Sequence, residues 1–197
     1  MPSKFSSHSF PKVYEDLGIS ISKLGCIMLD VEKLEVSDVI DSDHLYYASD
    51  KSHFWIDGIV SEKVPHVTLL YGLMRSGMEM QKHVDAVLEL VEAGDFPDYF
   101  PREVVIEEVS FFESNLPDEP YYCLIAKVSP LNLKEVNDRL RLLPHCNTFP
   151  DYEPHITLAY IKKDETLRDG YVELLNTRFA GKTVEALALN YGGDKSE

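Results

Sequence analysis

The chain has 197 residues, of which 44% are apolar and 27% charged, and its 34 acidic and 19 basic residues give a net charge of -15. A chain of this length forms one domain or two small lobes that share a core, and no apolar run is long enough to cross a membrane. Proteins bind long DNA or RNA through many lysine and arginine contacts with phosphates, and a surface this acidic repels such polymers. Any nucleic-acid-like ligand should therefore be short and held in a local pocket.

The ends of the chain and its cysteines bear on its cellular location. The start, MPSKFSSHSF, is polar and lacks the apolar core of a secretion signal. We expect residues 1–20 to form a loose N-terminal arm, residues 21–192 a single bilobal domain and residues 193–197 a flexible C-terminus. The 3 cysteines show no CxxC spacing, so reduced thiols in a cytoplasmic protein are the expected state.

Strands and helices are predicted to alternate along the chain. Apolar runs rich in strand-forming residues predict strands over residues 25–31, 44–49, 66–73, 102–114, 121–129, 155–162 and 182–191. Apolar residues at helical spacing predict helices over residues 79–93, 131–143 and 164–177. Residues 51–63 have no clean period and are expected to form a loop or short edge structure. The pattern is that of an α+β protein.

One short motif occurs twice. His66-Val67-Thr68-Leu69 returns as His155-Ile156-Thr157-Leu158, 89 residues later, and a proline precedes each copy. Each copy lies on a predicted strand that is followed by a helix and a further strand. We interpret this order as a duplicated α+β unit, with the two motif strands central and side by side.

The motif places an imidazole and a hydroxyl together. Residues i and i+2 of a strand point to the same face, so each copy presents its histidine and threonine to one space. Two imidazoles suit proton transfer at phosphorus, where one accepts a proton from the attacking hydroxyl or water and the other donates one to the leaving oxygen. The threonine hydroxyls can donate hydrogen bonds to the phosphate oxygens. The arrangement needs no metal, and we expect no cofactor.

A structural role for these histidines is the alternative. A single histidine on an apolar strand is more often a hydrogen-bonded structural residue than a catalyst. The second full copy of the motif, on a strand in the other half of the chain, makes that alternative the less favoured one.

At these residues the sequence resembles the 2H phosphoesterase superfamily, which is defined by paired HxTx motifs in a duplicated α+β fold. The superfamily includes RNA 2′,3′-cyclic phosphodiesterases, proteins named for 2′-5′ RNA ligase activity, and phage-encoded members. The resemblance spans roughly residues 20–192 and implies two pseudo-twofold-related lobes with antiparallel sheets flanking a central cleft and helices outside. It also implies a metal-independent phosphodiesterase with His66 and His155 as acid and base and Thr68 and Thr157 gripping the phosphate.

The stretch GIVSEKVPHVTLLYGL is most similar to phage-borne members of this superfamily. Some of these resemble the anti-CBASS phosphodiesterases, which hydrolyse the cyclic di- and trinucleotides that bacteria use as immune signals. The resemblance thus implies host-defence evasion in the cytoplasm of a bacterial host. An RNA-end enzyme and a nucleotide-binding module without catalysis remain the alternatives, and assembly of several copies to close the pocket is left open.

Substrate bases need flat side chains to stack on, and several aromatics are candidates. Phe112 and Trp55 are our substrate-binding candidates, because alternation allows only one of the adjacent pair Phe111 and Phe112 to face the cleft. Tyr71 and Tyr160 occupy matching motif positions that strand alternation places opposite the histidines, so we expect them to pack in the core. Three lysines could attract phosphate, although isolated lysines usually serve solubility; they are Lys127, Lys162 and Lys163.

Overall fold

The computed structural model describes residues 24–47, 64–90, 97–114, 120–129, 131–146 and 151–192. The strands in these ranges are β1 (Gly25–Val31), β2 (His66–Leu73), β3 (Glu103–Glu113), β4 (Tyr121–Val128), β5 (His155–Lys162) and β6 (Thr183–Gly192). The helices are α2 (Gly77–Val87), α3 (Leu131–Leu140) and α4 (Glu165–Phe179), and a short 3₁₀ helix, η2, covers Ser42–His44.

Most of the predicted elements are confirmed, and one is wrong. In residues 44–47, the described part of the strand predicted over residues 44–49, the structure instead has the end of the 3₁₀ helix and an isolated bridge between Leu45 and Ile161. The loss has a local cause, because the Asp41 side chain accepts a hydrogen bond from the Asp43 N–H and so favours a turn at this point. Residues 48–63, which include the predicted loop, lie outside the described ranges, as do residues 1–23 and 193–197.

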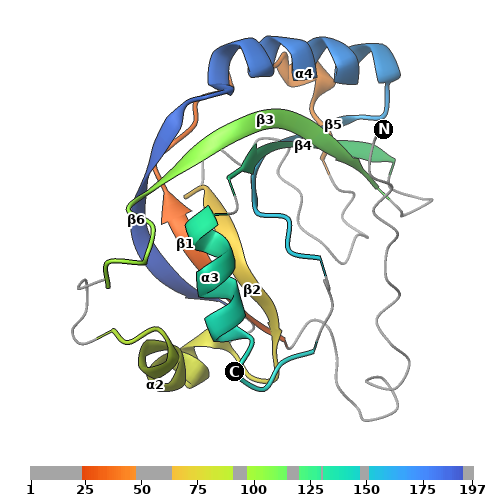
Figure 1. Ribbon diagram of the computed structural model, residues 1–197. Helices are drawn as coiled ribbons and strands as arrows, with labels where there is room; N and C mark the ends of the chain where they lie inside the picture. Colours follow the sequence, from red (N-terminus) through yellow and green to blue (C-terminus); the bar gives the residue numbers. More distant parts are fainter. Residues whose placement is uncertain are drawn as a thin grey trace.

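All strand pairs are antiparallel, and the strand order β1-β2-β5-β4-β3-β6 closes on itself (Figure 1). Two repeats of a strand-strand-helix-strand unit generate this order. The first repeat is β1-β2-α2-β3 and the second is β4-β5-α4-β6, with α3 inserted after β4. The last strand of each repeat pairs with the other repeat, so the two lobes are β6-β1-β2 and β3-β4-β5. The α+β bilobal architecture with antiparallel sheets is thereby confirmed.

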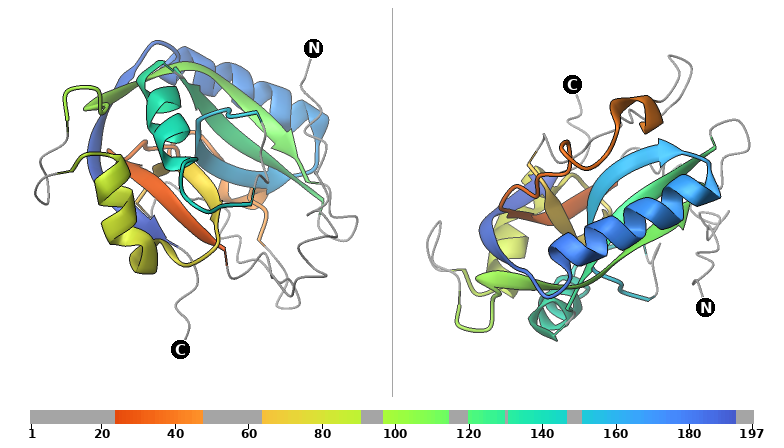
Figure 2. Two further views of the ribbon diagram at one scale, coloured as in Figure 1. Left: turned by 60° about the horizontal axis from the view of Figure 1, so that its bottom comes forward. Right: turned by 90° about the horizontal axis from the view of Figure 1, so that it is seen from above.

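The helices lie outside the strands (Figure 2). Helix α4 packs on β3 and β4, whereas α3 packs on β2 and α2 on β6. Helix α2 begins with a capping box between Ser76 and Glu79, and the Asp164 side chain caps α4. In the described ranges, none of the helices has the length and apolar character that crossing a bilayer requires.

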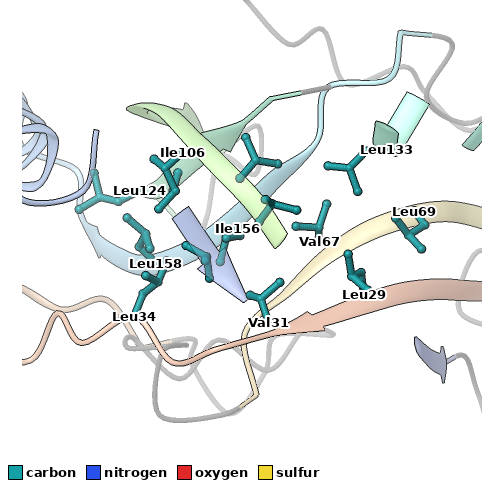
Figure 3. Close-up of a cluster of buried hydrophobic side chains, with 14 of the residues drawn as sticks. Leu29, Val31, Leu34, Val67, Leu69, Ile106, Leu124, Leu133, Ile156 and Leu158 are labelled. Carbon is teal, nitrogen blue, oxygen red and sulfur yellow. The ribbon is translucent and has the colours of Figure 1, made fainter. Parts of the chain in front are cut away.

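The strands enclose an apolar core. Figure 3 shows side chains from β1 to β5 pointing toward one another, among them Leu29, Val67, Leu69, Ile106, Leu124, Ile156 and Leu158, all of which are fully buried. Alternate residues of the same strands are half-buried and face away from this core. That second face of β2 and β5 carries the histidine and the threonine of each motif.

Candidate active site

The two motifs lie on neighbouring strands. Strands β2 and β5 pair through Val67 and Ile156, which are both completely buried. Extending this register by one residue in each direction sets the histidine of each motif beside the threonine of the other. Cross-strand neighbours have Cβ atoms about 4.5–5.5 Å apart. The predicted meeting of the two motifs is therefore confirmed, in a crossed arrangement.

The four motif side chains share one face. His66, Thr68, His155 and Thr157 are all half-buried and alternate with fully buried neighbours. They form a compact group of two imidazoles and two hydroxyls at the seam between the lobes, on the face opposite the core.

His155 is held in one orientation. Its Nδ1 lies 2.9 Å from the carbonyl oxygen of Glu153, so Nδ1 donates this hydrogen bond and Nε2 keeps the lone pair of the neutral ring. Burial lowers the pKa of His155, and the charge of the nearby His66 lowers it further, against an opposing effect of the hydrogen bond to Glu153. A neutral imidazole with a free Nε2 is suited to accept a proton.

The neighbours of the motifs repeat across the pseudo-twofold axis, with one difference. A cysteine lies beside the tyrosine of each motif strand, as Cys26 with Tyr71 and Cys123 with Tyr160. An apolar residue lies beside each threonine, Met28 in one lobe and Ile125 in the other. The neighbours of the histidines differ in charge, since Asp30 pairs with His66 and Lys127 with His155.

Each of these charged neighbours has a polar partner. The Asp30 carboxylate lies 3.3 Å from Asn190 Nδ2, and Lys127 Nζ lies 2.8 Å from Glu108 Oε1. Among the described residues, nothing donates a hydrogen bond to the His66 ring or accepts one from it.

The prediction that Tyr71 and Tyr160 pack in the core is wrong. Both are half-buried like the histidines and threonines, whereas the core-facing residues of the same strands are buried. The cause is a bulge in each motif strand. The register skips Leu69 on β2 and the equivalent leucine on β5, so residues beyond that point change faces.

The aromatic candidates are placed differently from one another. The Phe112 ring contacts the His155 ring edge-to-face, with centroids 4.9 Å apart. Phe111 lies instead against Tyr122, with centroids 5.4 Å apart, and beneath the Arg168 guanidinium of α4. Phe112 is thus the member of the pair that contacts His155, and its role in binding substrate stays a prediction. Trp55 lies outside the described residues.

Two groups near the site were not predicted. Tyr152 precedes β5 and its hydroxyl donates to the Thr68 carbonyl oxygen, at 3.2 Å, which ties the two motif strands together. A row of rings also leads away from Tyr160, because Tyr121 packs on Tyr160 and Tyr46 packs on Tyr121 at centroid distances of 5.4 and 5.3 Å. These contacts join residues that are far apart in the chain, so no local sequence pattern indicates them.

The arrangement is equipped for proton transfer around a phosphate. It offers two imidazoles on neighbouring strands, hydroxyls that can donate to nonbridging oxygens, and one lysine beside His155. All three cysteines are free thiols, and burial raises the pKa of Cys123 to about 12, so this thiol stays protonated.

Comparison with known proteins adds the following findings. Two solved structures of Usb1 from Kluyveromyces marxianus, one of them with uridine monophosphate, are similar to the chain at TM-scores of 0.45 and 0.44. Each is 13% identical in sequence, over 88% of this chain and 96% of that one. No curated protein matches. The family described as the 2′-5′ RNA ligase superfamily matches residues 44–193, more than half of the chain and both motifs. The chain therefore belongs to the 2′-5′ RNA ligase superfamily of 2H phosphoesterases and is a phosphodiesterase.

Proposed function

We propose that the protein hydrolyses 3′–5′ phosphodiester bonds of small cyclic oligonucleotides. The observation that carries this proposal is the crossed placement of the two motifs, with two histidines and two threonines on one face of neighbouring strands. His66 and His155 act as general acid and base, and Thr68 and Thr157 hold the phosphate. No metal takes part in the proposed reaction.

The proposed reaction begins within the substrate. One imidazole accepts the proton of the ribose 2′-hydroxyl next to the bond, and the 2′-oxygen forms a bond to phosphorus. The bond from phosphorus to the 5′-oxygen breaks, and the other imidazole donates a proton to that oxygen. The product is a 2′,3′-cyclic phosphate, which water then opens with the two roles exchanged.

The charge of the chain supports a small substrate. At a net charge of -15 the surface repels long RNA more than it repels a di- or trinucleotide, which carries few phosphates. We propose a cyclic di- or trinucleotide as the partner, with no long nucleic acid and no membrane. The proposed setting is the cytoplasm of a bacterial host, where a phage would use the enzyme to evade host defence.

A second candidate function acts on RNA ends. The matching family is named for 2′-5′ RNA ligase activity, which favours an RNA 2′,3′-cyclic phosphodiesterase or a ligase-like enzyme. Such an enzyme would use the same histidines on a terminal 2′,3′-cyclic phosphate.

One experiment separates the two candidates. The purified protein is incubated in EDTA with 3′,3′-cGAMP and, separately, with an RNA that ends in a 2′,3′-cyclic phosphate. We expect turnover of 3′,3′-cGAMP, and His66→Ala and His155→Ala should each reduce the rate by about 10²- to 10⁴-fold. His83→Ala is the matched control, because His83 is exposed on α2. Turnover of the RNA alone would favour the second candidate, and turnover of neither would refute both.

A further inference from the structure

The positions beside the two histidines carry opposite charges. Glu108, Lys127 and His155 are register partners on β3, β4 and β5, so their side chains leave the sheet on the same face in one row. At the pseudo-symmetric position of the other lobe, Asp30 lies beside His66. Among the residues that the structure describes, the register partner of His155 is thus a cation and that of His66 an anion.

Lys127 forms an exposed ion pair with Glu108, which it can leave for another anion at little cost. Its Nζ lies 2.8 Å from Glu108 Oε1, and the two side chains are 32% and 56% exposed. Ion pairs at this exposure contribute little to stability, because water screens them. A lysine ammonium sits on a flexible stem, so it can turn from Glu108 toward a stronger anion at little cost.

We propose that Lys127 binds the nonbridging oxygens of the substrate phosphate beside His155, and that Glu108 holds Lys127 in place while the site is empty. A phosphodiester is an anion, and a chain of net charge -15 needs a local cation to bind one. The two other candidate lysines lie at the far end of β5 from His155, where Lys162 donates to the Asp43 carbonyl oxygen at 2.5 Å and Lys163 pairs with Glu113. The proposal adds a substrate-binding residue to the phosphodiesterase and does not depend on which nucleotide it cleaves.

The test measures phosphate binding directly. Inorganic phosphate is titrated into the full chain at neutral pH, and the dissociation constant is read from the NMR signals of the histidine rings. Lys127→Met should weaken binding about 10-fold or more, as expected for a lost charge-assisted hydrogen bond. Glu108→Gln should tighten it about two- to fivefold, because the competing carboxylate is gone.

Controls separate this role from a structural one. Lys134→Met removes a similar ion pair, with Asp138 on α3, and should leave the dissociation constant unchanged. Lys127→Arg should retain most of the binding, because the charge is kept. An equal dissociation constant for wild type and Lys127→Met, or no binding of phosphate by wild type, would overturn the proposal. Failure to cleave 3′,3′-cGAMP would affect only the proposed substrate, since this test uses phosphate alone.

Discussion

The seam between the two motif strands depends on one side chain that can be changed with little disturbance. Strands β2 and β5 share the pair Val67 and Ile156, and next to it the Tyr152 hydroxyl donates to the Thr68 carbonyl oxygen at 3.2 Å. Tyr152→Phe keeps the ring, which packs against the core, and removes the hydrogen bond. The net loss should be about 0.5–1.5 kcal/mol of the free energy of unfolding. With a urea dependence of about 2–3 kcal/mol/M, the midpoint falls by roughly 0.2–0.8 M.

The same substitution should reduce activity. Thr68 follows His66 by two residues, so a shift of this backbone moves both groups relative to the phosphate. Small misplacements of catalytic groups cost as much as 100-fold, and we expect kcat/KM to fall by about 10-fold. The assay is steady-state cleavage of whichever nucleotide the wild type turns over, beside urea unfolding followed by circular dichroism.

A second tyrosine provides the matched control. The Tyr191 hydroxyl on β6 donates to Asp85 Oδ1 of α2 at 2.5 Å, outside the group of motif side chains. Tyr191→Phe should cost about 1–2 kcal/mol of stability and leave kcat/KM unchanged. The reasoning is refuted if Tyr152→Phe retains full kcat/KM, or if Tyr191→Phe loses as much activity as Tyr152→Phe does.

Three further predictions follow from single contacts. Burial lowers the pKa of His155, and Phe112→Ala should expose the His155 imidazole and so raise that pKa. The acidic limb of the pH profile of kcat/KM should then move to higher pH, and an unmoved limb contradicts this reasoning. Asn176→Leu removes hydrogen bonds to the N–H and carbonyl of Val109, at 2.7 and 2.8 Å, and should cost about 2–4 kcal/mol in urea unfolding; a cost near zero contradicts it. Because burial raises the pKa of Cys123 to about 12, a thiol reagent at pH 8 should label this cysteine only after unfolding, as mass spectrometry of the peptides would show.

The sequence was sufficient to predict the motif strands and the face on which the histidines lie. Strand alternation places each histidine and threonine together, and the second copy of the motif indicates that the strands meet. Alternation failed beyond Leu69 and Leu158, where a bulge in each strand changes the face of the following residues. Two adjacent buried residues mark each bulge, Leu69-Leu70 and Leu158-Ala159, and this doubled apolar position was the available signal.

Contacts between distant parts of the chain could not be predicted. The exchange of β3 and β6 between the two repeats depends on pairing across the whole fold, which no local pattern encodes. The hydrogen bond from Tyr152 to Thr68 and the pairing of Lys127 with Glu108 arise from the same long-range registers. Lys127 could be named as a candidate from its charge, but its place beside His155 required the structure.

The duplication explains why two imidazoles meet. The residues around them break the pseudo-twofold symmetry, and this difference bears on which histidine accepts a proton and which donates one. Cleavage of a phosphodiester requires one proton acceptor and one proton donor, so two identical half-sites would have to differ in protonation alone. Here they differ in their surroundings as well. His155 is turned by the Glu153 carbonyl, contacted by Phe112 and paired with a lysine, whereas His66 is paired with the Asp30 carboxylate. Because burial lowers the pKa of His155 and its Nε2 keeps the lone pair, we propose that His155 accepts the proton in the first step and that His66 donates one to the leaving oxygen.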